Sequence, residues 1–145
     1  MTARILNIES RRRKNRIGIV CPTDFHFSEG DTIDAQAVIE SPNISLYCLD
    51  HECQRALFVE TPADVDLSQT PFYYQAQYEN TVGLFAVPYE ELHRLANDIR
   101  IDSKCLILIY SVGRSGSTLL SSALNQVENI VSLSEPDIYA QLVAI

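Results

Sequence analysis

One short segment, between residues 106 and 120, combines the residue types that bind anions. It reads LILIYSVGRSGSTLL, so a run of aliphatic residues gives way to two glycines, an arginine and several hydroxyl residues before the aliphatic pattern returns. Glycine permits backbone conformations that a Cβ would obstruct, and successive N–H groups in such a turn can point into one concavity. The amides and side chains of this segment offer hydrogen-bond donors and a cation, which predicts a bound anion.

The residues of the candidate anion site follow one another without a gap. A guanidinium is a planar cation suited to phosphate oxygens, hydroxyl side chains add donors, and the first amides of a following helix lie at its positive end. The candidate binding residues are Gly113, Arg114, Ser115, Gly116, Ser117 and Thr118.

The loop that binds nucleoside triphosphates reads G-x-x-x-x-G-K-[ST]. Alignment on Gly116 and Thr118 places Ser111 at the first glycine and Ser117 at the lysine. The lysine that reaches the β- and γ-phosphates is therefore missing, which weakens the triphosphate interpretation without removing it.

The elements around this loop are expected to alternate between strands and helices. The continuous apolar run at 105–110 is typical of a strand buried on both faces of a parallel sheet. An amphipathic helix follows at about 118–127, then a second strand at 129–134, and Pro136 is well placed to begin another helix. This order predicts parallel strands with a right-handed connection.

The segment GRSGSTLL resembles the 5′-phosphosulfate-binding loop of the sulfotransferase family, which commonly reads [KR]-[ST]-G-[ST]-[ST]. That family has a P-loop-like α/β fold and uses 3′-phosphoadenosine 5′-phosphosulfate as donor. The resemblance therefore implies a P-loop-like parallel sheet, the start of a three-layer α/β/α domain. The SEP at 134–136 resembles the bacterial and tyrosylprotein branches, in which a glutamate at the end of the next strand is the catalytic base. The resemblance covers about residues 104–145 and implies that Glu135 and Arg114 are catalytic.

The implied function is that of a sulfotransferase, or a fragment of one, which transfers a sulfuryl group to an acceptor hydroxyl. Glu135 would take the acceptor's proton, a role worth roughly 10²–10⁴-fold in rate, and Arg114 would stabilise charge on the departing phosphate. Both residues would lie at the carboxyl ends of parallel strands. If these strands are neighbours, or have one strand between them, the two sites would be about 5–10 Å apart. The acceptor stays open among sugar, lipid, peptide tyrosine and small alcohol.

Two other classes of function remain open. The first is a kinase or other nucleotide-binding protein with a degenerate P-loop. The second is a non-catalytic binding module whose N-terminal hairpin recruits a partner. Glu135 could equally be a carboxylate that satisfies amides at a helix start.

Residues 1–100 are expected to form a strand-containing α+β region of unknown function, and residues 101–145 to begin the nucleotide-binding domain. We expect 1–16 to be loose and 23–32 to be loop, while 73–80 could be helix or strand. The expected strands are 17–20, 44–50, 55–61 and 82–88, the second and third as an antiparallel hairpin, and the expected helix is 89–100.

Bulk properties restrict the partners. The 145 residues carry a net charge of −8, which argues against broad binding to nucleic acid or anionic membranes. The four cysteines show no metal-site spacing, so we expect reduced thiols, no metal and a cytoplasmic location. The longest apolar run is too short to span a bilayer. Two strands and two helices cannot cover both faces of a parallel sheet. The family resemblance also implies a later arginine and serine for the donor's 3′-phosphate, and no such pair follows residue 118. Both points predict a truncated chain.

Overall fold

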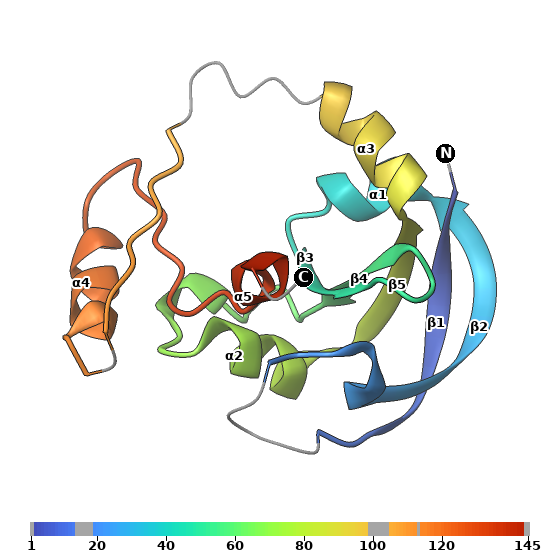
Figure 1. The fold of residues 1–145 in the computed structure, drawn as a ribbon, viewed down its shortest axis with the longest axis horizontal. Coiled ribbons are helices and arrows are strands. Elements are labelled where there is room, and N and C mark those ends of the chain that lie inside the picture. Colours follow the sequence, from blue (N-terminus) through green and yellow to red (C-terminus); the bar gives the residue numbers. More distant parts are fainter. Residues whose placement is uncertain (1, 14–18, 99–104, 113, 144–145) are drawn as a thin grey trace.

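The structure, a computed structural model, describes residues 2–13, 19–98, 105–112 and 114–143. Five strands form one antiparallel sheet in the order β2-β1-β5-β4-β3 (Figure 1). The strands are β1 (Thr2–Arg11), β2 (Phe25–Asp34), β3 (Ile44–Asp50), β4 (Arg55–Glu60) and β5 (Gly83–Pro88). The helices are α1 (Ala35–Glu40), α2 (Tyr73–Asn80), α3 (Tyr89–Asp98), α4 (Ser117–Leu124) and α5 (Ile138–Val143), with 3-10 turns η1 (Pro22–Asp24) and η2 (Leu67–Gln69).

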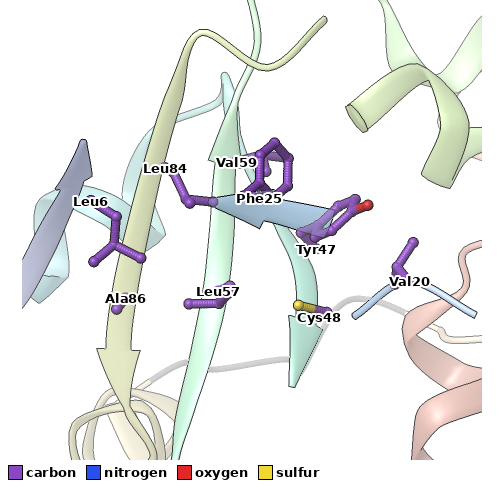
Figure 2. Close-up of a cluster of buried hydrophobic side chains, with 9 residues drawn as sticks. All are labelled: Leu6, Val20, Phe25, Tyr47, Cys48, Leu57, Val59, Leu84 and Ala86. Atoms are coloured by element: carbon purple, nitrogen blue, oxygen red, sulfur yellow. The ribbon is translucent and has the colours of Figure 1, made fainter. Parts of the chain in front are cut away.

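The sheet buries apolar side chains on both faces because alternate residues of a strand point to opposite sides. One face carries the cluster in Figure 2, formed by Leu6, Val20, Phe25, Tyr47, Cys48, Leu57, Val59, Leu84 and Ala86. Tyr74 and Tyr78 of α2 pack against this face. The opposite face is covered by α1 and α3, and its cluster contains Ala3, Ala35, Val38, Ala56, Phe58, Val87 and Leu95.

The expected hairpin is confirmed. β3 pairs antiparallel with β4, from Ile44 opposite Glu60 to Asp50 opposite Arg55. The tight connection places Gln54 at φ +53°. The strand expected at 82–88 is β5, and the helix expected from residue 89 is α3. The ambiguous stretch 73–80 is the helix α2.

Two expectations for the N-terminal region are wrong. Residues 2–11 form an interior strand of the sheet, β1, which pairs with both β2 and β5, and they are not loose. Residues 25–34 form the edge strand β2 and are not a loop. β2 alternates buried or half-buried aromatics with exposed polar residues, as in Phe25, His26 and Phe27. The exposed polar residues of this strand made it look like a loop in the sequence. Among them is His26, whose Nδ1 atom lies 2.8 Å from a carboxylate oxygen of Glu9 on β1.

The expected parallel P-loop-like sheet is also wrong. The structure is a mixed α+β fold with an antiparallel sheet, to which the C-terminal third contributes no described strand. Neither 105–110 nor 129–134 has strand structure, so the pairing that a parallel sheet requires is absent from these two segments. The apolar side chains of 106–110 are 47% to 82% exposed rather than buried on two faces. Strands of the first 88 residues supply the whole sheet instead.

Both helices expected in the C-terminal third are present. α4 begins at Ser117, and α5 begins at Ile138, two residues after Pro136. In Figure 1, α4 stands apart from the sheet, whereas α5 lies close to β3, which it contacts. In the part of the chain that the structure describes, no helix has the length and apolar character needed to cross a membrane.

Candidate functional site

The turn before α4 has a backbone conformation that favours glycine. Gly116 is the N-cap residue of α4 and lies at φ 87° and ψ 15°. A Cβ at this position would meet no atom within 4 Å, so the backbone conformation, and not a lack of space, is what requires glycine. Arg114 is also left-handed, at φ 63°. Gly113, the first residue of the predicted site, lies outside the described residues.

This turn leaves donors available. The Gly116 carbonyl accepts the hydrogen bond from Leu120 N–H, at 3.1 Å, with which α4 begins. The N–H groups of residues 117–119 consequently have no partner within the helix. Arg114 and Ser115 are exposed, and Ser117 and Thr118 are half-buried. Amides, hydroxyls and a guanidinium are thus accessible at one end of α4, as an anion site needs.

Glu135 has an unfavourable backbone conformation. It lies at φ 53° and its side chain is exposed. The following Pro136 favours an extended conformation for the residue before it, and a left-handed conformation costs a residue with a Cβ about 1–2 kcal/mol. Such strained residues persist only where their surroundings hold them, and they cluster at functional sites.

Hydrogen bonds on both sides of Glu135 hold this conformation. The Ser134 carbonyl accepts from Tyr73 N–H at 2.9 Å. The Asp137 Oδ2 atom accepts from Val20 N–H at 2.5 Å. Because these partners belong to α2 and to the segment before β2, Glu135 lies between two anchors on the N-terminal region.

Gln141 anchors α5 to the edge of the sheet. Its Oε1 atom accepts from Leu49 N–H of β3 at 2.7 Å. Its Nε2 atom donates to the Val20 carbonyl at 2.5 Å. The Gln141 side chain therefore provides a hydrogen-bond partner for the Leu49 N–H on the edge strand β3, where no neighbouring strand of the described residues supplies one.

Serine and asparagine side chains join α4 to the segment that carries Glu135. Ser132 Oγ donates to Ser121 Oγ at 2.9 Å. The Asn125 side chain accepts from Ser132 N–H at 2.7 Å and donates to the carbonyls of Ser132 and Ser68, both at 2.9 Å. Ser121 lies about 6 Å along the helix from Ser117, at 1.5 Å per residue. The turn and the glutamate segment thus belong to one hydrogen-bonded unit.

The structure does not bring the two predicted catalytic side chains into contact. Among the described residues, no hydrogen bond or ion pair joins Arg114 to Glu135. The placement expected from neighbouring parallel strands is wrong, because neither residue follows a strand. Any substrate that touches both must therefore span the interval between the start of α4 and the residue before Pro136.

A polar cavity of about 190 Å³ lies beside this unit. Its walls come from the start of β3, the connector after β4, the first residue of α2 and Leu133. Four hydroxyl side chains line it, those of Ser45, Thr61, Ser68 and Tyr73. Burial raises the pKa of Tyr73, although the hydrogen bond with Ser45 acts in the opposite direction. The Tyr73 hydroxyl is therefore neutral at ordinary pH.

Another buried polar contact lies under α5 and is structural. Tyr47 donates its hydroxyl proton to Asp24 Oδ2 at 2.7 Å, and both side chains are buried. Burial, reinforced by Asp24, raises the pKa of Tyr47, so the phenol stays a hydrogen-bond donor. Sequence reasoning did not identify Asp24, Asn125 or Gln141, because an isolated Asp, Asn or Gln carries no motif.

The cysteines around the β3–β4 turn do not form a metal site. Cys48 is buried, whereas Cys53 is exposed and its N–H donates to Asp50 Oδ1 at 3.2 Å. His51 Nδ1 lies 3.1 Å from the Tyr89 hydroxyl. Within the described ranges, no group of three or more His, Cys, Asp and Glu side chains could hold a metal ion.

Comparisons with known proteins give no relative from which a role could be transferred. No family model, no curated protein and no solved structure matches this chain. Any functional assignment consequently depends on the chemistry and geometry of the residues described above.

Proposed function

We propose that this chain takes part in sulfuryl transfer from 3′-phosphoadenosine 5′-phosphosulfate to an acceptor hydroxyl. In this proposal, residues 113–118 bind the 5′-phosphosulfate and Glu135 is the general base. The observation that carries the proposal is the turn at the start of α4, where Gly116 is left-handed and Arg114 is exposed. The amides of 117–119, which follow this turn, have no partner within the helix because they belong to its first turn.

The donor set suits a phosphosulfate. Its oxygens are acceptors only, and the turn supplies backbone amides, the hydroxyls of Ser115, Ser117 and Thr118, and one guanidinium. The place where a Cβ of Gly116 would stand is open, so a ligand can approach the backbone there. The absence of a lysine at Ser117 favours this ligand over a nucleoside triphosphate.

The chain's own residues would have distinct roles in the reaction. Glu135 accepts the proton of the acceptor hydroxyl, whose oxygen forms a bond to sulfur. The bond between sulfur and the 5′-phosphate oxygen breaks, and 3′-phosphoadenosine 5′-phosphate leaves with that electron pair. Arg114 and the amides of the turn stabilise the charge that develops on the departing phosphate. In-line displacement of this kind depends mainly on positioning and charge stabilisation, by analogy with phosphoryl transfer.

The strained backbone of Glu135 supports its assignment as the base. A residue that only satisfied amides at the start of α5 would need no left-handed conformation before a proline. The anchors at Ser134 and Asp137 hold the carboxylate-bearing residue in one backbone conformation. Such preorganisation is what general-base catalysis requires.

The proposal includes two partners, a nucleotide donor and a hydroxyl-bearing acceptor, and a cytoplasmic location. The location is proposed because Cys21, Cys48, Cys53 and Cys105 are free thiols, as expected in a reducing compartment.

The test is calorimetric titration with 3′-phosphoadenosine 5′-phosphate. We expect saturable binding that Arg114→Ala weakens about tenfold or more, the loss of a charge-assisted contact worth roughly 1.5–3 kcal/mol. Gly116→Ala should weaken binding about fivefold, since alanine resists the left-handed conformation. Gly116→Asn is the matched control and should bind nearly as the wild type does, because asparagine tolerates that conformation.

Two results would contradict the proposal. One is the absence of heat at millimolar nucleotide. The other is equal affinity of the wild type and Arg114→Ala. Magnesium-dependent binding of ATP in place of the bisphosphate would favour the degenerate P-loop alternative.

A further inference from the structure

We infer that the cavity beside α2 binds a small, neutral polyol the size of one sugar ring, and that this polyol is the acceptor of the proposed transfer. The role of the polyol as acceptor rests on the proposed function, whereas its binding rests on the cavity alone. The volume of the cavity is about 190 Å³. It is smaller than the ~300–1,000 Å³ of pockets for drug-sized ligands.

The charge of the lining favours a neutral ligand rich in hydroxyls. None of the described residues that line the cavity is Lys, Arg or His, so an anion would lack a counter-charge. Asp66 brings a carboxylate, and Asn43 brings a side-chain amide that both donates and accepts. Together with the four hydroxyl side chains, these groups can exchange hydrogen bonds with several hydroxyls of one ligand. Apolar side chains, among them Val65 and Leu133, supply surface for the carbon-bound hydrogens of a ring.

Several of the polar groups are fixed by their own partners. Gln77 Nε2 donates to Ser45 Oγ at 2.8 Å, and Gln77 is buried. Asp66 Oδ1 accepts from the N–H and the hydroxyl of Ser68, at 2.9 and 2.7 Å. No hydrogen bond to Asp66 Oδ2 is found among the described residues, so this oxygen remains free to accept from a ligand hydroxyl. A wall ordered in this way binds without a large entropic cost.

The cavity adjoins the segment that carries the proposed base. Leu133 lines it, and Tyr73, which also lines it, donates its N–H to the Ser134 carbonyl. Glu135 is two residues from Leu133, at most about 7 Å along the chain. Ser68 also lines the cavity, and its carbonyl accepts from the Asn125 side chain at the C-terminal end of α4. A ligand here therefore lies next to the Glu135 segment and close to the C-terminal end of α4, the helix whose first turn would hold the donor.

The test is a ¹⁵N NMR titration of the full chain with D-glucose and with myo-inositol. We expect saturable shifts at the amides of residues 66–68 and 73, with a dissociation constant on the order of 1–10 mM. Cyclohexanol, which has a ring but one hydroxyl, should give no such shifts. Glucose 6-phosphate should bind more weakly than glucose, because the cavity has an acidic residue and no cation.

Variants separate binding in the cavity from non-specific effects. Tyr73→Phe and Ser68→Ala each remove one hydroxyl and should weaken glucose binding about fivefold. Ser28→Ala is the matched control, since Ser28 is exposed on β2, at the edge of the sheet opposite β3.

Each outcome has a distinct meaning. Absence of saturation with both polyols, equal binding of cyclohexanol, or unchanged affinity in both Tyr73→Phe and Ser68→Ala would overturn the inference. The titration with 3′-phosphoadenosine 5′-phosphate is independent. Nucleotide binding without polyol binding would overturn only the inference, and polyol binding without nucleotide binding would support the cavity while contradicting the proposed function.

Discussion

Replacement of Gln141 by alanine should lower the free energy of unfolding substantially, although Gln141 belongs to a helix of only six residues, α5. Gln141 is 9% exposed and makes two hydrogen bonds to backbone groups, at 2.7 Å from Leu49 N–H and at 2.5 Å to the Val20 carbonyl. Each bond contributes about 1 kcal/mol, and a buried backbone group left without a partner costs about 1–3 kcal/mol. Since Val20 is 2% exposed, water does not easily replace the lost donor there. The expected loss is about 2–4 kcal/mol.

Urea unfolding followed by circular dichroism measures this loss as a lower midpoint with an unchanged slope. The control is Gln36→Ala, which removes an exposed side chain bonded to Glu40 at 2.8 Å and should change stability by less than about 0.5 kcal/mol. If Gln141→Ala cost no more than Gln36→Ala, the docking of α5 on the edge of β3 would be refuted. The position of Glu135, which depends on the same anchorage, would then lose its support.

Two further predictions concern ionisable side chains. Burial alone would raise the pKa of Asp50, but the hydrogen bonds from Arg55 Nε, at 2.9 Å, and from Cys53, together with the charge of Arg55, outweigh burial, so the pKa lies below its ordinary value. The resulting stability should be present above about pH 4 and lost as the pH falls through the folded-state pKa, and urea unfolding of Arg55→Met across this range should show a weaker dependence. Burial raises the pKa of Cys48, whereas Cys105 is exposed. Iodoacetamide followed by mass spectrometry should modify Cys105 in the native chain and Cys48 only on unfolding, and equal rates would contradict the burial.

Local signals predicted much of the N-terminal fold. The β3–β4 hairpin and the helix after β5 depend on residues close in sequence, so alternation and helical spacing identified them. β1 was missed because its pairing with both β2 and β5 is non-local, and its many polar residues lie on exposed faces. The position of a strand in a sheet depends on its neighbouring strands, and these cannot be identified from a local sequence pattern.

The C-terminal third shows the opposite error. The run at 105–110 has the composition of a buried strand, but composition cannot supply the neighbouring strands, and the described structure pairs it with none. The conformation of Gly116 was foreseeable from glycine and its position before a helix. The anchors of Glu135 were not, because Val20 and Asp137 are 117 residues apart.

The most direct test of the central claim is a ¹⁵N NMR titration with 3′-phosphoadenosine 5′-phosphate, observed at the amides that begin α4. We expect the largest saturable shifts at residues 116–119, where N–H groups lack helical partners. We also expect these shifts to shrink in Arg114→Ala. Saturable shifts confined to other parts of the chain, or no shifts at millimolar nucleotide, would contradict the claim that this turn binds the donor.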